Sequence, residues 1–354
     1  MRRRQASKLG DFIHCVTPLV LSLALGATAM AAVNPQKSAT AGRYCTATAE
    51  AMFKACSFEL QDDYWRGVAV CTNFSDAPER GRCEADNNAA RREAVQLCQD
   101  TYNVRRDSCR DLGEARYDPD FDEVLTEQNY ASPTYVNRYF PIKIGNRWEY
   151  NGGGESVAVE VVNETKLVDE VTCVVVRDLV STGGFVAEAT DDWLAVAITG
   201  DVWYCGEEVK DYELFDGDRP QRPELTRIDG SFKVGRENAK AGIQFPGSPR
   251  EGRVYLEEFA LGNAEDLAEI LSTDYSYGED KELDRFVPRA LARLMCHDDC
   301  VVTENTNRNE PGSLEVKYYA PGVGLFLSIH PEEGTALLLT GCNVDPKCQQ
   351  LPAR

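Results

Sequence analysis

The stretch Cys71–Cys83, CTNFSDAPERGRC, lies between two segments of helical composition and carries a cysteine at each end. Asp76 and, three residues later, Glu79 form a capping box, and Pro78 is tolerated in the first turn of a helix, so a helix is predicted to begin here. Residues 43–112 around this stretch contain one proline and many Ala, Arg, Glu and Gln residues. The segment is therefore predicted to be an antiparallel helical hairpin that turns within residues 73–81.

Six cysteines flank this turn symmetrically, with successive separations of 11, 15, 12, 15 and 11 residues. A helix returns to within roughly 20° of the same face after 11 residues and to within about 60° after 15. Each helix therefore presents three cysteines on one face, at matching distances from the turn. Antiparallel folding then predicts the disulfides Cys45–Cys109, Cys56–Cys98 and Cys71–Cys83. Each bridge is expected to add about 3 kcal/mol, which offsets the small core of a two-helix unit.

The first 31 residues have the layout of a secretory signal peptide, with a basic start, an apolar run over Val16–Leu25 and small residues over Ala27–Ala31. The apolar run is shorter than the roughly 20 residues that span a bilayer, so we expect cleavage and no membrane span in the mature chain. The thirteen cysteines agree with export, because disulfides persist in oxidising compartments. We expect a secreted or periplasmic protein, with residues 32–42 as a polar spacer.

The composition changes after the helical segment. Residues 113–137 are predicted to be an acidic linker, residues 138–342 a β domain and residues 343–354 a C-terminal tail. In the β domain, valines and aromatic residues alternate with polar ones between recurrent glycine-rich turns, a pattern typical of antiparallel strands. About ten strands are expected, enough for a barrel-like or strongly curved sheet, with one inserted helix over Lys281–Met295 that Pro288 kinks or shortens. The predicted fold class is α+β with segregated domains.

Three β-hairpins can be placed from their turns. They join Val171–Val180 to Phe185–Leu194, Trp193–Thr199 to Val202–Glu207, and Gly324–Ile329 to Thr335–Thr340. The second hairpin is expected to turn at Gly200 and Asp201. This register puts Leu194, Val196 and Ile198 on one face, which we expect to be the core face.

The same register leads to an expectation for two cysteines of the β domain. It places Cys173 near Asp192 and Cys205 near Val196, two strands and about four residues apart. At ~4.8 Å per strand and ~3.3 Å per residue, that separation is too long for a disulfide. We therefore predict that Cys173 and Cys205 do not pair with each other. The closely spaced Cys296–Cys300 and Cys342–Cys348 are candidate local bridges.

Charge and motif content exclude several functions. The chain has 38 basic and 58 acidic residues, a net charge of -20, which argues against binding nucleic acid or an anionic membrane surface. No G-x-S-x-G motif occurs, Ser248 lies in a turn, and a serine triad would need His297 or His330. A C-x3-C pair such as Cys296 and Cys300 in an exported chain is typical of a disulfide, so no zinc site is predicted.

Calcium is the one cofactor for which the sequence offers candidate ligands. Asp118, Asp120 and Asp122 begin like an EF-hand loop, although Glu123 and Asn129 stand where such a loop needs glycine and glutamate. Asp216-Gly217-Asp218 and Asp191-Asp192 are further acidic segments that could supply oxygen ligands. Solvated carboxylates are the ordinary alternative, and no cofactor is otherwise expected.

Paired carboxylates could support acid–base catalysis. The densest candidates are Glu257 with Glu258, and Glu265, Asp266 and Glu269. Adjacent residues of a strand point to opposite faces, so Glu257 and Glu258 are not expected to line one cleft. We expect an exposed acidic face instead, and no catalytic residue is assigned.

Aromatic residues are the best candidates for a ligand site. Those that could line an apolar cavity are Trp148, Tyr150, Trp193, Trp203, Tyr204, Tyr318 and Tyr319. Ordinary packing in the core of the sheet is the alternative, and it is the more common use of such side chains.

Several segments of the β domain also match a family pattern. They are YFPIKIGNRWEY at 139–150, CVVVRD at 173–178, DVWY at 201–204 followed by Gly206-Glu207, AED at 264–266 and KYYAPGVG at 317–324. In this order they resemble a family of secreted bacterial β-rich domains with no established activity. The resemblance implies the fold class and leaves the function open. The chain departs from the pattern at Phe232, where the family often has Trp, and at residues 236–239, which replace a glycine-rich turn.

The leading hypothesis is a non-enzymatic exported binding protein with an apolar ligand cavity in the β domain. The expected partner is a small apolar ligand or another protein. One alternative is a secreted hydrolase that uses acidic residues or calcium. Another is a structural or interaction module in which the helical hairpin is a stalk or a partner-docking rod.

Overall fold

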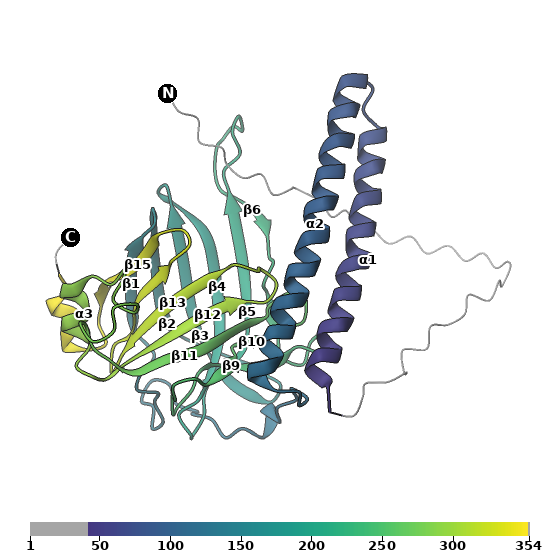
Figure 1. Ribbon diagram of the computed structural model, residues 1–354. Helices are drawn as coiled ribbons and strands as arrows, with labels where there is room; N and C mark the ends of the chain where they lie inside the picture. Colours follow the sequence, from purple (N-terminus) through teal and green to yellow (C-terminus); the bar gives the residue numbers. More distant parts are fainter. Residues whose placement is uncertain (1–41, 353–354) are drawn as a thin grey trace. The chain divides into compact units, whose positions relative to one another are not determined.

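The computed structural model describes residues 42–352, so the predicted signal peptide and most of the predicted spacer lie outside the described residues. Two helices, α1 (Tyr44–Thr72) and α2 (Ala77–Leu112), form an antiparallel hairpin (Figure 1). Among the described residues, one further α-helix follows, α3 (Arg289–Met295), with two short 3-10 helices, η1 (Phe121–Glu123) and η2 (Pro346–Gln350). The rest of the chain folds mainly as antiparallel strands.

Three disulfides join α1 to α2, and they are the three bonds that the cysteine spacing predicts. The Cα–Cα distances are 5.6 Å for Cys45–Cys109, 5.8 Å for Cys56–Cys98 and 5.4 Å for Cys71–Cys83. At the turn, the Asp76 side chain accepts a hydrogen bond from the Glu79 N–H at 2.9 Å and caps α2. The even spacing of the three bonds leaves little freedom for one helix to slide or turn along the other.

The helices also approach closely at Gly67. A Cβ atom there would lie 2.1 Å from Oδ1 of Asn87, whose amide donates a hydrogen bond to the Tyr64 carbonyl at 3.0 Å. Glycine therefore leaves room for the Asn87 side chain between the Cys56–Cys98 and Cys71–Cys83 bonds.

Fifteen strands form one antiparallel sheet, more than the ten or so expected from the sequence. The first eight are β1 (Arg147–Gly152), β2 (Glu155–Val168), β3 (Val171–Thr182), β4 (Phe185–Val196), β5 (Val202–Glu213), β6 (Glu224–Arg227), β7 (Phe232–Lys233) and β8 (Lys240–Phe245). The others are β9 (Val254–Leu256), β10 (Glu258–Phe259), β11 (Asp266–Tyr275), β12 (Cys300–Asn307), β13 (Leu314–Ala320), β14 (Gly324–His330) and β15 (Thr335–Cys342).

The sheet curls into a nearly closed barrel whose two ends meet at Glu257. The strand order is β10-β8-β5-β4-β3-β2-β1-β15-β14-β13-β12-β11-β9. The terminal strands β9 and β10 are separated in the chain only by Glu257, so one short segment pairs with both ends of the sheet. A Cβ at Gly242 of β8 would lie 1.9 Å from the Glu257 carbonyl oxygen, so glycine is needed for this close contact.

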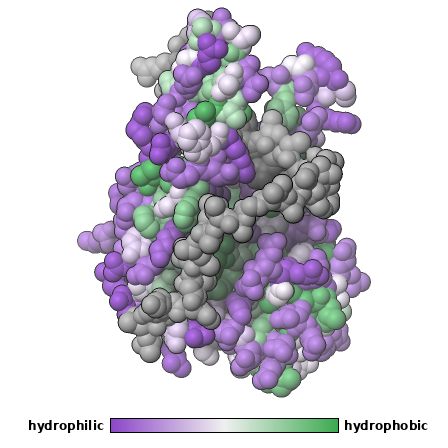
Figure 2. Space-filling model, turned by 90° about the vertical axis from the view of Figure 1, so that its right-hand side faces the viewer, coloured by the Kyte–Doolittle hydropathy of each residue, from purple (hydrophilic) through white to green (hydrophobic). Residues whose placement is uncertain are grey.

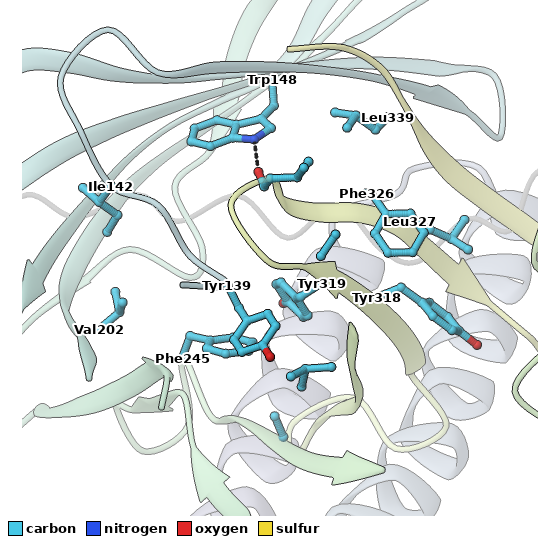
Figure 3. Packing of buried hydrophobic residues seen from close by; sticks show 14 of the residues in the cluster. Tyr139, Ile142, Trp148, Val202, Phe245, Tyr318, Tyr319, Phe326, Leu327 and Leu339 are labelled. Carbon is cyan, nitrogen blue, oxygen red and sulfur yellow. Dashed lines mark hydrogen bonds between the residues drawn. The ribbon is translucent and has the colours of Figure 1, made fainter. Parts of the chain in front are cut away.

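Strand alternation divides the apolar residues between two clusters. Val174 and Val176 of β3 belong to the larger, interior cluster, together with Trp148, Phe245 and Tyr319 from distant strands (Figure 3). Cys173 and Val175 of β3 instead join a smaller cluster on the outer face.

The expectation that Cys173 and Cys205 do not pair is wrong. They form a disulfide between β3 and β5, with a Cα–Cα distance of 6.7 Å. Val174 pairs with Leu194, which puts Cys173 beside Ala195 of the intervening strand β4. Cys205 is the extra residue of a β-bulge that lies across from Trp193 and Leu194. The two cysteines are thus nearly level, and the small Ala195 side chain leaves room for a bridge across β4.

The register error arises at both turns. At the β3–β4 turn Thr182 pairs with Phe185 and a bulge follows at Val180 and Ser181, so Cys173 lies opposite Ala195 instead of Asp192. At the β4–β5 turn Val196 pairs with Val202, so the connection comprises residues 197–201 instead of the two-residue turn expected. Within this connection Ala197 forms a bridge with Thr126, and the Ile198 N–H donates to the Leu125 carbonyl at 2.9 Å. Ile198 is 46% exposed and does not belong to the core, whereas Leu194 and Val196 do.

The remaining sequence-derived elements are close to their expected positions. Both local bridges form, at Cys296–Cys300 and Cys342–Cys348. The first and third predicted hairpins are present as β3–β4 and β14–β15. The predicted helix over Lys281–Met295 begins only after Pro288, at Arg289, because proline has the fixed φ and missing N–H that suit a helix start.

A buried ion cluster joins α2 to the β domain. Arg105 of α2 contacts Glu265 through two hydrogen bonds of 2.7 and 3.1 Å, and Arg308 contacts the same carboxylate at 3.2 Å. Arg105, Glu265 and Arg308 are 5%, 0% and 4% exposed. The sequence-based expectation that Glu265 lies on an exposed acidic face is therefore wrong.

The disulfide ladder should contribute strongly to stability. Replacing Cys56 and Cys98 together by alanine opens a long loop, and loop entropy predicts a loss of about 4 kcal/mol in the free energy of unfolding. The control is the double alanine variant of Cys296 and Cys300, whose short loop predicts a loss of about 2 kcal/mol. Urea unfolding followed by circular dichroism measures both; equal losses would contradict the entropic account.

The ion cluster should stabilise the attachment of the hairpin. Glu265→Gln leaves two buried guanidinium groups without a counter-charge, so a loss of about 3–5 kcal/mol is expected. The control is Asp107→Asn, which breaks the exposed Arg110–Asp107 pair and should cost about 1 kcal/mol or less. Urea unfolding followed by tryptophan fluorescence compares the two variants, and a Glu265→Gln loss no larger than the control would refute this role.

Candidate ligand-binding site

The interior of the barrel contains a partly open chamber of about 210 Å³. Nine strands, β1–β5, β8 and β13–β15, contribute lining residues from their inward faces, and the segment before β1 adds Phe140, Pro141 and Ile142. An apolar cavity of roughly 150 Å³ is large enough to hold one benzene molecule. The chamber can therefore hold a molecule slightly larger than a single aromatic ring.

Four of the seven predicted aromatic residues line this chamber: Trp148, Tyr150, Tyr204 and Tyr319. The Trp148 indole N–H donates to the Val323 carbonyl at 2.7 Å, a bond visible in Figure 3, and the Tyr150 hydroxyl donates to the Leu325 carbonyl at 3.0 Å. These bonds orient both rings and satisfy their polar atoms, so their apolar surfaces are available to a ligand.

The structure places the other three aromatic residues elsewhere. Trp193 belongs to the outer cluster beside the Cys173–Cys205 disulfide, with the Lys166 ammonium 3.3 Å from its ring centroid, and Trp203 packs against that cluster. Tyr318 is buried in the core, where its hydroxyl donates to the Leu283 carbonyl at 2.6 Å. Side chains alternate between the two faces of β4 and β5, and Trp193 and Trp203 point away from the chamber. The strand register expected from the sequence did not show which residues face the interior.

Charged side chains also line the chamber, and sequence reasoning did not assign them to it. They are Asp178, Asp192 and Lys317. Asp191-Asp192 is an acidic segment that could have supplied calcium ligands, but the two residues lie within β4 and face opposite sides. Asp191 forms an ion pair with Arg177 at 2.8 Å on the other side of the sheet. Both residues lie within the predicted strand Phe185–Leu194, so strand alternation by itself already implies this separation.

A chain of hydrogen bonds leads from the chamber through Tyr204. Its hydroxyl contacts Oδ1 of Asp192 and lies 3.1 Å from Oε2 of Glu207. A tyrosine hydroxyl carries one hydrogen, so both bonds can form only if one carboxyl group is itself protonated. Burial, then repulsion from Asp192, raises the pKa of Glu207 to about 9, whereas the pKa of Asp192 is raised to about 6 by burial. Glu207 is thus the group that holds the proton at neutral pH.

Asp178 lies at the chamber wall with one oxygen unpaired. Its Oδ1 atom is buried and has no hydrogen-bond partner. Burial is the main cause that raises the pKa of Asp178 to about 8, and repulsion from Asp192 and Glu188 adds to it. Asp178 is therefore mostly protonated at pH 7.

Further carboxyl groups lie near the closure of the barrel. Glu257 and Glu258 are 4% and 8% exposed, so the expected exposed acidic face is wrong for them as well. Both are buried because Glu257 lies in the break between β9 and β10, where strand alternation does not apply. The Asn305 amide donates to Glu257 at 2.7 Å. Burial is the main cause that raises the pKa of Glu257 to about 7 and that of Asp266 to about 6.

Lys317 is the only cation among the described residues that line the chamber. Its ammonium group lies 3.0 Å from a Glu315 carboxylate oxygen, and Glu315 also accepts a hydrogen bond from Ser328. Burial is the largest single influence and would lower the pKa of Lys317, but attraction to Glu315, Tyr319 and Glu257 together outweighs it, and the pKa is raised well above its ordinary value. The Lys317 charge is therefore already compensated by a neighbour on β13.

The other candidate metal ligands from the sequence are not gathered into a metal site in the described part of the chain. Cys296 and Cys300 are joined to each other, so they are not zinc ligands. Asp118 pairs with Lys240. Within residues 42–352, no group of three or more His, Cys, Asp or Glu side chains is arranged to hold a metal ion.

The buried carboxyl groups predict how stability depends on pH. The pKa of Asp178 is raised from its ordinary value of 3.8 to about 8 in the folded chain. Between about pH 4 and pH 8 the folded protein therefore binds more protons than the unfolded chain does. The free energy of unfolding should be highest below this interval and should fall as the pH rises through it. Asp178→Asn should make this fall shallower and should raise stability at pH 8.

Urea unfolding at pH 5, 6.5 and 8 measures this effect in the wild type and in Asp178→Asn. Asp191→Asn is the matched control, because it removes a carboxylate from the opposite face of the sheet and should leave the slope nearly unchanged. A wild-type stability that increases from pH 5 to pH 8 would contradict the argument.

Comparison with protein-family models, with curated proteins and with solved structures gives no match for this chain. The resemblance to secreted bacterial β-rich domains therefore stays a prediction, and the functional argument rests on the geometry of the chamber.

Proposed function

We propose that this chain is an exported, non-enzymatic binding protein whose β domain holds one small, largely apolar ligand inside the barrel. The observation that carries the proposal is the chamber of about 210 Å³ lined by Trp148, Tyr150, Tyr204 and Tyr319. Core packing normally fills such space, because protein interiors approach crystal density. Aromatic side chains whose polar atoms are already bonded are well suited to enclose an apolar molecule.

The disulfides support the exported location. Within residues 42–352, six disulfides account for all twelve cysteines. Such a density is typical of proteins that fold in an oxidising compartment. Of the helices that the structure describes, none has the length and apolarity to cross a membrane.

The helical hairpin is proposed to be a rigid arm beside the binding domain. Its three disulfides hold the two helices in one alignment, while several large apolar side chains remain exposed toward the turn. Phe58, Trp65 and Val70 of α1 are 76%, 64% and 54% exposed. Figure 2 shows hydrophobic side chains among hydrophilic ones at this projecting end. A stalk and a docking rod for a protein partner both agree with this surface.

A hydrolase is the second candidate, and one observation favours it. Asp178 and Asp192 both line the chamber; burial raises the pKa of both, to about 8 for Asp178 and to about 6 for Asp192, whose pKa the Tyr204 hydrogen bond lowers. One protonated and one ionised carboxyl group are the pair that acid–base hydrolysis requires. A screen of ester, glycoside and phosphoester substrates at pH 7, with and without calcium, tests this candidate; turnover that Asp192→Asn abolishes would replace the binding proposal.

The binding proposal is tested by filling the chamber. Native mass spectrometry of the full chain, and ligand-observed NMR with indole and benzyl alcohol as probes, should show one bound molecule per chain. Val176→Phe projects a ring into the chamber and should abolish binding, whereas Val186→Phe changes an exposed position and should not.

Circular dichroism and non-reducing peptide mapping check that both variants keep the fold and the six disulfides. Absence of any copurified molecule, together with no binding of either probe to the wild type, would refute the proposal. Equal binding by Val176→Phe and Val186→Phe would place the ligand outside the chamber and would also refute it.

A further inference from the structure

We infer that the chamber is selective for an organic cation: a small molecule with an apolar ring or short chain and one protonated amine, bound by the carboxylates of Asp178 and Asp192. This inference rests on the proposed binding function and adds the chemical class of the ligand. It starts from the charges that face the chamber, which are two aspartates and one lysine.

The lysine does not balance the aspartates. Lys317 is held by Glu315 on its own strand at 3.0 Å, and the further buried carboxyl groups Glu257 and Asp266 also act on it. Among the described lining residues, no second cation faces Asp178 and Asp192. The part of the chamber next to β3 and β4 therefore has an excess of acceptors, and a ligand with hydrogen-bond donors and positive charge complements it.

Asp178 lacks the donor that a buried oxygen needs. Its neighbour in register on β4 is Thr190, but the Thr190 hydroxyl donates to Glu188 at 3.0 Å. On β2 its neighbour is Val159, which has no polar side-chain atom. Oδ1 of Asp178 is consequently buried without a partner. An unpaired buried acceptor costs about 1–3 kcal/mol, and a donor brought by a ligand recovers that cost.

The two aspartates are placed to share one ammonium group. Asp192 pairs with Val176 and Asp178 pairs with Thr190, so the aspartates are diagonal neighbours on the same face of β3 and β4. Diagonal side chains of an antiparallel pair lie roughly 7 Å apart at Cβ, a span that two carboxylates can close around one nitrogen. An ammonium has three donors and can bond to both.

The aromatic walls complete the site. Tyr204 is bonded to Asp192, and Tyr150 lies near enough to Asp178 for the aspartate charge to contribute to the raised pKa of the tyrosine. Aromatic faces attract cations and also pack against the apolar body of a ligand. A carboxylate pair beside aromatic rings therefore recognises both halves of an organic amine.

The inference also predicts release of a proton on binding. At pH 7 Asp178 is mostly protonated, whereas Asp192 is mostly ionised. An ammonium beside Asp178 favours its ionised form, so the Asp178 proton passes to the buffer as the complex forms. No covalent step is involved, and the ligand keeps its own proton.

Calorimetry with matched probes tests the inference on the full chain at pH 7. Benzylamine, benzyl alcohol and benzoate have similar size and differ in charge. Benzylamine should bind roughly ten- to a hundredfold more tightly than benzyl alcohol, and benzoate should bind most weakly. Titrations in phosphate and in Tris, which differ in ionisation enthalpy, should show release of up to one proton with benzylamine only.

Two variants separate this site from a merely structural effect. Asp178→Asn should bring benzylamine down to the affinity of benzyl alcohol while benzyl alcohol still binds. Asp191→Asn should behave as the wild type, because its carboxylate is paired with Arg177 on the other face of the sheet. Circular dichroism and non-reducing peptide mapping check that both variants keep the fold and the six disulfides.

Failure of the inference and failure of the proposed function give different results. If the wild type binds benzyl alcohol as tightly as benzylamine, or if Asp178→Asn keeps the preference, the cation selectivity is refuted and the binding function stands. If none of the three probes binds, the chamber is not a site for molecules of this size, and both proposals are refuted.

Discussion

Closure of the sheet at Glu257 is the contact on which the rest of the β domain depends. The segment that contains β9 and β10 pairs with both ends of the strand order, and Gly242 admits the Glu257 backbone at a distance that no side chain would allow. Closure removes the exposed edges of a long antiparallel sheet, which otherwise pair with other chains. It also turns one face of every strand toward a common interior, so residues far apart in sequence come together there.

The interior that results is not a purely apolar core. Aromatic and aliphatic residues dominate it, yet Asp178, Asp192 and Glu257 lie within it. Desolvation disfavours their ionised forms, and repulsion from neighbouring carboxylates such as Glu188 and Asp266 adds to this effect, so protons are retained near neutral pH. The buried carboxyl groups thus destabilise the empty domain, and a cationic ligand would reduce this destabilisation. Sites of this kind combine recognition with a loss of intrinsic stability, because the same unpaired oxygen serves the ligand and destabilises the empty protein.

The hairpin and the barrel are stabilised in different ways. The barrel has a large core, whereas the two helices bury few side chains and depend on three covalent bonds. Arg105 joins the two parts through a carboxylate, Glu265, that also binds Arg308. Buried ion clusters contribute little net stability compared with apolar packing, but they allow only one docking geometry, since any other leaves a buried charge unpaired.

The sequence by itself determined the hairpin almost completely, including the pairing of six cysteines. Helical rise and rotation are constant, so the intervals between Cys45, Cys56 and Cys71 convert directly into positions in space. The fold class and two of the three predicted β-hairpins were also readable, because turn residues and alternation act over short distances. In the β domain, by contrast, the pairing departs from the expected register at two turns. The β3–β4 turn is two residues long and is followed by a bulge, and Ala197, which forms a bridge with Thr126, belongs to a β4–β5 connection longer than expected. Only the tertiary structure could therefore pair Cys173 with Cys205 and bring Asp178 and Asp192 to one chamber, because register and bulges depend on packing between strands that no local pattern encodes.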